Sequence, residues 1–140
     1  MKNKTLAQDY VMRCQSRLKA IESLYGDQNW ADVVRESQEV VELSLKAVLR
    51  NSSIDPPRIH DVSQVLKENE ALLPALIRQN LEEVSRISKT LRRDRELSFY
   101  GSEDLTPSEF YEQSDADQAK DWAKFIVELV VQSVGSVPPA

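Results

Sequence analysis

The segment that decides the fold reads WADVVRESQEVVELSLKAVL, from Trp30 to Leu49. Its apolar and small residues recur with a period of about 3.5, which places them on one face of an α-helix. The residues on this face are Trp30, Val33, Val34, Ser37, Val40, Val41, Ser44, Leu45, Val48 and Leu49. So regular a face predicts a helix, over about Asn29 to Arg50, that packs against at least two neighbouring helices.

Apolar residues recur every three or four positions elsewhere as well, which predicts an all-α chain. The expected helices run from about Thr5 to Tyr25, from His60-Asp61 through Leu66, from about Ala75 to Phe99 (the longest), and from a capping box at Ser114–Asp117 to about Val134. We expect Gly26 and Gly101 to end helices, Asp27 or Asn29 to cap the second helix, and residues 101–113 to be irregular. The predicted fold is one domain over residues 1–140, an antiparallel up-and-down bundle of four long helices plus one short helix, with a frayed tail over about residues 135–140.

Composition limits the classes of function. The formal net charge of −5 gives no whole-molecule field that attracts nucleic acid, so phosphate binding needs a local basic patch and no DNA specificity is expected. The single cysteine, Cys14, excludes an internal disulfide and lies on an apolar helical face, where a buried hydrophobe is the plainer interpretation. With His60 as the only histidine, a well-formed zinc site is excluded, and we expect neither a metal nor a cofactor.

The sequence shows neither a targeting signal nor a membrane-spanning segment. No apolar run follows the N-terminal residues Met1 to Lys4, so no signal peptide is expected. The most apolar stretch, Ile126 to Val131, is interrupted by Glu128 and is too short to cross a bilayer. We therefore expect a cytoplasmic protein that does not bind membranes.

The candidate functional segment reads LRRDRELSFYG, from Leu91 to Gly101. Five cations lie within ten residues in and before it, at Arg86, Lys89, Arg92, Arg93 and Arg95. Arginine makes bidentate contacts with phosphate oxygens, although a solvated helix face with cations near its C-terminal end is the plainer interpretation. The inward stripe that includes Ile77 and Leu91 reaches Arg95 after about five turns. A buried charge is costly, so we expect Arg95 to line a cleft or to meet a carboxylate.

Tyr100, His60 and Lys46 are further candidate site residues, and each also has a plainer structural interpretation. Tyr100 either belongs to the site or closes the helix end as an aromatic plug. His60 follows a Pro-Pro loop, where a capping or core histidine is the commoner case. Lys46 and Glu42 are spaced i, i+4, which favours a surface ion pair unless that face turns toward a cleft.

Several of these pieces resemble the HEPN domain family. Residues 39–49 are similar to its Q-x-x-E-K-x-L-K-A-L-L signature, with Glu42, Lys46 and Ala47 in place. His60-Asp61, followed by Val65-Leu66, is similar to its H-D-L-x-x-L element. Residues 95–103 resemble the R-x-x-x-x-Y-G-D-E form of one branch, and Tyr111 and the helix start at Asp115-Ala116 fit the next segment of that branch.

The resemblance implies a homodimer with a cleft at the subunit junction, lined by the ends of the long helices. In many members an arginine and a histidine carry out metal-free RNA cleavage, in which a ribose 2′-OH attacks the phosphate. This chain departs from that pattern, because position 100 is tyrosine. A phenol with a pKa near 10 is only about one part in a thousand ionised at pH 7, which makes it a poor general base. Ser102 stands where the toxin branch has a tyrosine that its partner modifies.

These residues support three hypotheses. The first is a non-histidine HEPN homodimer that binds nucleotide or RNA phosphate through Arg93, Arg95 and Lys46, with Arg92 and His60 as further ligand residues. Its partner would be a separately encoded minimal nucleotidyltransferase, in a toxin–antitoxin type of pair. The second is an active RNase toxin that uses Arg95 with Tyr100, or His60 as a remote base. The third is a non-catalytic helical scaffold.

Overall fold

The structure is a computed structural model that describes residues 2–58, 61–100 and 105–134, with the side chains of residues 3–58, 61–94 and 105–134. Its helices are α1 (Lys2–Gly26), α2 (Trp30–Asn51), α3 (Val62–Glu68), the 3₁₀ turn η1 (Glu70–Leu72), α4 (Ala75–Gln79), α5 (Leu81–Tyr100), α6 (Pro107–Phe110) and α7 (Gln113–Val134). No strand occurs among these residues. The predicted helical bundle is therefore confirmed, while the expected helix end at Gly101 and the tail over residues 135–140 lie outside the described residues.

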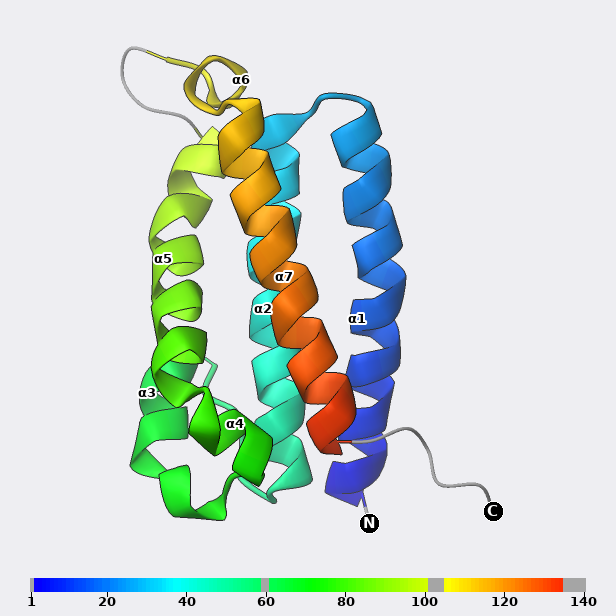
Figure 1. Cartoon of the computed structure of the whole chain (residues 1–140), viewed down its shortest axis with the longest axis vertical. Helices are drawn as coiled ribbons and strands as arrows, with labels where there is room; N and C mark the ends of the chain where they lie inside the picture. The colour runs from blue at the N-terminus through cyan, green and yellow to red at the C-terminus, as the bar shows by residue number, and fades with distance from the viewer. Residues whose placement is uncertain (1, 59–60, 101–104, 135–140) are drawn as a thin grey trace.

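Four long helices, α1, α2, α5 and α7, stand side by side and alternate in direction (Figure 1). α2 is the central one, because it packs against α1, α7 and α5. The prediction of at least two neighbours is thus confirmed with three. Figure 1 shows α3 and α4 at the end of the bundle where α5 begins, and α6 at the opposite end, beside the last turns of α5.

The core consists mainly of the apolar faces of these helices. From α2 it takes Val33, Val34, Val40, Val41, Leu45, Val48 and Leu49, and from α7 Ala116, Ala119, Ala123, Ile126, Val127 and Val130. Full burial of each Val, Leu or Ile stabilises the fold by about 1.5–3 kcal/mol. Cys14 is buried among them and accepts a hydrogen bond from the Ser44 hydroxyl at 3.2 Å. Burial raises the pKa of the Cys14 thiol, against the opposing effect of Ser44, as suits a packing residue.

The turn between α1 and α2 differs in detail from the prediction. Gly26 is the last residue of α1, and Gln28 takes the left-handed conformation with φ 59°. Asn29 caps α2, because its side-chain oxygen accepts a hydrogen bond from the Asp32 backbone N–H at 3.3 Å. Of the two expected caps, the structure therefore uses Asn29.

The predicted single helix from Ala75 to Phe99 is wrong, because it is broken at Asn80 into α4 and α5. The Asn80 side-chain amide donates to the Leu76 carbonyl at 2.8 Å, and Asn80 itself has φ −112° and ψ 14°. Asparagine favours such breaks because its side chain competes with the backbone for hydrogen bonds. The longest helix is α1, with 25 residues.

The segment after α5 also holds more structure than expected. Thr106 caps the four-residue helix α6, and Pro107 occupies its first turn. The capping interaction of α7 starts at Glu112, whose backbone N–H donates to the Asp115 carboxylate at 2.8 Å. The box expected at Ser114 does not form, because Asp117 instead accepts a hydrogen bond of 2.5 Å from the Tyr25 hydroxyl.

Candidate functional site

The candidate segment occupies the second half of α5. Its inner face is apolar, because Val84, Ile87 and Leu91 are buried against the other helices. Arg92 and Arg93 lie on the exposed side of the same helix. Arg93 is 75% exposed, and its Nε donates to the carboxylate of its chain neighbour Asp94 at 3.3 Å. Two adjacent arginines therefore face solvent at this end of the bundle.

Arg95 and Tyr100 are placed by their backbone alone, because their side chains lie outside the described residues. The helical backbone runs without a break from Leu91 to Tyr100. This continuity keeps the periodicity on which the prediction for Arg95 rests. Ile77 lies on α4, before the break at Asn80, so only the residues from Leu81 onward define the helical register of Arg95.

Tyr111 joins the segment after α6 to the candidate segment. Its hydroxyl donates a hydrogen bond of 2.8 Å to the backbone carbonyl of Asp94, and the residue is only 5% exposed. Burial, together with the nearby carboxylates of Asp94 and Asp115, raises the pKa of Tyr111 to about 12. The phenol therefore stays protonated at neutral pH and acts as a fixed donor one residue before Arg95.

Phe110 lies beside this contact and was not identified from the sequence. Its ring meets the Tyr111 ring edge to face, with centroids 4.9 Å apart and an interplanar angle of 70°. Phe110 keeps 39% of its surface exposed. A cap followed by proline at Thr106-Pro107 is the signal that could have revealed the short helix that presents Phe110.

Lys46 lies on a different face of the bundle. It pairs with Glu42 at 3.6 Å, as its spacing predicted, and Glu42 also accepts a hydrogen bond of 3.1 Å from Gln38. The groove at this place measures about 270 Å³ and is lined by Arg13, Arg17, Glu39, Glu42, Leu43 and Lys46. The structure therefore sets Lys46 beside α1, whereas Arg92 and Arg93 belong to α5. His60 lies outside the described residues.

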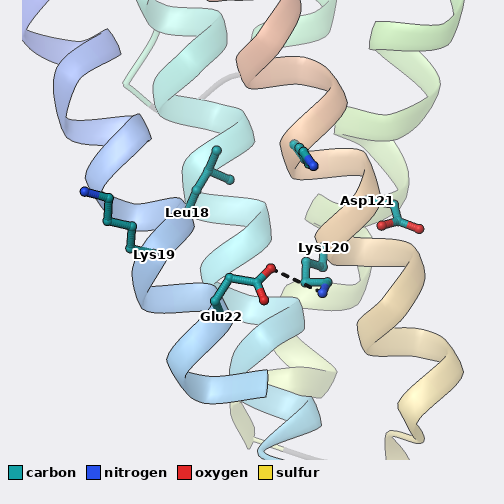
Figure 2. A pocket seen from close by; sticks show the side chains of 6 residues that line it. Leu18, Lys19, Glu22, Lys120 and Asp121 are labelled. Carbon is teal, nitrogen blue, oxygen red and sulfur yellow. Dashed lines mark ion pairs between the residues drawn. The ribbon is translucent and has the colours of Figure 1, made fainter. Parts of the chain in front are cut away.

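A second groove, of about 300 Å³, lies between α1 and α7 (Figure 2). Lys120 and Glu22 point toward each other across it and pair at 3.2 Å, while Asp121 points away. The Lys120 ammonium also lies 4.1 Å from the centre of the Tyr25 ring. An acid and an aromatic ring therefore already hold this ammonium, and the ion pair joins α1 to α7 across the groove.

Comparison with protein families gives one decisive finding: the family model described as HEPN domain matches residues 7–134. This chain belongs to the HEPN domain family. Searches of curated proteins and of solved structures gave no match.

In this HEPN chain the motif residues named from the sequence fall on separate elements. Glu42, Lys46 and Ala47 lie on α2, and Asp61 caps α3 through a hydrogen bond of 2.9 Å from the Ser63 backbone N–H. Arg95 to Tyr100 form the last turns of α5. Assignment of the HEPN chain to the branch with tyrosine at position 100 stays a prediction.

Metal ligands and membrane spans are the remaining features of interest in this HEPN domain. In the described ranges, no group of three or more His, Cys, Asp or Glu residues could hold a metal ion. Nor does any helix in that part of the chain have the length and apolar character needed to span a bilayer.

Proposed function

We propose that this HEPN protein binds the phosphate of a nucleotide or of RNA through the arginines of α5. Arg93 and Arg95 would be the direct ligands, and Arg92 would add charge. The observation that carries the proposal is the pair of neighbouring arginines exposed in the second half of α5, in a chain that is acidic overall. Family membership supports a function related to nucleotides or RNA.

The state of Arg93 suits this role. Its pairing with Asp94 joins two adjacent residues at the surface, and exposed pairs of this kind contribute only about 0–1 kcal/mol. A phosphate accepts two parallel N–H bonds from a guanidinium, whereas the Asp94 carboxylate accepts one from the Nε of Arg93, and the terminal phosphate of a nucleotide also carries more charge than a carboxylate. Phosphate can therefore displace Asp94 from Arg93 at little cost.

The proposal includes a homodimer, in which the α5 ends of two copies line a shared cleft. Lys46 would contribute from its groove beside α1, and His60 would be a further ligand residue. We also propose a separately encoded minimal nucleotidyltransferase as partner, in a toxin–antitoxin type of pair that acts in the cytoplasm. Light scattering should give twice the chain mass at micromolar concentration, and a monomer would contradict the shared cleft.

The binding test measures melting temperature with and without ATP. We expect ATP to raise it in the wild type, and the rise to be lost in Arg95→Ala and in Arg93→Ala. Arg78→Ala is the matched control, because Arg78 is an exposed arginine on α4, at the opposite end of the bundle. A rise that survives both α5 substitutions would contradict the assignment, and no rise with nucleotide or RNA would favour a scaffold.

The same variants separate binding from catalysis. We expect purified protein to leave RNA intact across a wide pH range, because no histidine follows Arg95 at the motif position. RNA cleavage that disappears in Arg95→Ala and in Tyr100→Phe would replace the binding role with an RNase role.

A further inference from the structure

An exposed aromatic ring lies next to the arginine segment. Phe110 and Leu105 are 39% and 41% exposed, whereas most large apolar side chains of the described residues are buried or half-buried. Phe110 does not depend on a flexible loop, because it ends the helix that Thr106 caps and its ring rests on Tyr111. The fold therefore holds a large apolar ring at the surface in a defined place.

The position of Phe110 relative to the arginines follows from two short contacts. The Phe110 ring touches Tyr111, and the Tyr111 hydroxyl bonds to the carbonyl of Asp94, which follows Arg93 in the chain. α6 packs directly on α5, and the two meet at the same end of the bundle (Figure 1). The contacts of Tyr111 thus bring the Phe110 ring to the end of the bundle that carries the arginine segment.

Ring and cation together match the two halves of a nucleotide. A guanidinium binds phosphate, whereas an exposed phenyl ring offers a face on which any base can stack. Inorganic phosphate and polyphosphate have no base, and the bases of a duplex are stacked inside it. A site that held phosphate alone would gain nothing from an exposed phenyl group beside the arginines.

Resting on the proposed function, we propose that Phe110 is a stacking platform for the base of the bound ligand. The ligand is therefore a phosphate that carries an unpaired nucleobase, either a free nucleotide or single-stranded RNA. Leu105 borders the platform with a second apolar surface. The base contact selects this class over base-free phosphates, while the arginines supply the charge attraction.

The test compares ATP with tripolyphosphate by titration calorimetry. We expect the wild type to bind ATP about tenfold more tightly, since stacking of one base on an aromatic side chain typically has at least this effect. Phe110→Ala should lose this preference without weakening tripolyphosphate binding, and Phe110→Tyr should keep it. Leu72→Ala, which removes a 63% exposed apolar side chain at the other end of the bundle, is the control and should behave as wild type.

A fluorescent variant provides a direct readout of stacking. In Phe110→Trp, ATP should quench fluorescence beyond the change seen in the wild type, and tripolyphosphate should not. Titrating single-stranded and duplex RNA of one sequence identifies the source: preference for the single strand over both duplex and ATP indicates RNA, and equal binding of ATP and single strand indicates a free nucleotide.

The outcomes distinguish the two proposals. Equal affinity for ATP and tripolyphosphate in the wild type, or a preference for ATP unchanged in Phe110→Ala, overturns the platform and leaves phosphate binding intact. Tighter binding of duplex than of single-stranded RNA also overturns it. If no ligand of the series binds, the proposed function fails, and the platform fails with it.

Discussion

Replacement of Tyr111 by phenylalanine tests the contact that organises the candidate site. The hydroxyl of Tyr111 donates to the Asp94 carbonyl at 2.8 Å, across a separation of 17 residues. Phenylalanine keeps the buried ring and its edge-to-face contact with Phe110 while removing only the donor. Any change in the free energy of unfolding therefore reports on the hydrogen bond and on the titration of the phenol.

The expected change in the free energy of unfolding has two parts. At pH 7 the loss of one hydrogen bond should lower the free energy of unfolding by about 1 kcal/mol. Above pH 10 the phenol itself titrates, and its pKa is about 12 in the folded protein against 10.0 ordinarily. The folded state then holds a proton that the unfolded state has lost, so the stability contributed by Tyr111 is complete below pH 10 and falls as the pH rises toward 12. A shift of two pKa units corresponds to at most about 2.7 kcal/mol, which screening by nearby solvent reduces to about 1–2 kcal/mol.

The assay is urea denaturation of wild type and Tyr111→Phe at pH values from about 7 to about 11.5. Subtraction of the two free energies removes the titration of every other tyrosine and of the lysines. We expect the wild type to be more stable at pH 7 and its advantage to shrink above about pH 10. Tyr10→Phe, on α1, controls for the loss of a phenol as such. A difference between wild type and Tyr111→Phe that stays constant over the whole pH range would refute the reasoning.

Two further substitutions test the bundle that carries the site. Asn29→Ala should lower the free energy of unfolding by about 1 kcal/mol in urea denaturation, because it removes the cap of α2. Asn29→Ser should cost less, because serine also caps and places no second carboxylate beside Asp32, whose carboxylate accepts a bond from the Asn29 amide at 2.7 Å. Equal losses in the two variants would show that the cap is unimportant. Leu45→Ala, at a fully buried position of the central helix, should lower the free energy of unfolding by about 2–5 kcal/mol through lost burial and a cavity. Far-ultraviolet circular dichroism at low urea should stay unchanged. A loss below about 1 kcal/mol would contradict the packing.

The helices were predictable where burial is periodic. The bounds of α2 agree with expectation to within a residue, because the helix buries one continuous face and carries polar residues opposite. The break at Asn80 was missed because the apolar stripe continues across it, from Ile77 to Leu81. The two helices are separated by the backbone conformation of Asn80 and by the hydrogen bond from its side chain to the Leu76 carbonyl, and periodicity registers neither.

The candidate site was also predictable in part. The arginines of α5 were identified from the sequence, since a cluster of cations in an acidic chain is visible without a structure. Phe110 and Tyr111 were not assigned these roles, because α6 is only four residues long and forms no repeating pattern. The capping box expected at Ser114 was wrong for a related reason: Asp117 bonds to Tyr25, which lies 92 residues away in the chain.

By itself, the sequence determined that this protein is an all-α bundle with a basic segment near the end of one helix. Periodicity, helix propensity and local charge are properties of residues that are near one another in the chain, so they can be read from the sequence alone. Only the tertiary structure decided that Tyr111 bonds to the Asp94 carbonyl, that α6 with Phe110 packs on α5, and that Lys46 faces α1. These contacts depend on how one helix end packs against another, and the distances that define them arise only once the core has closed.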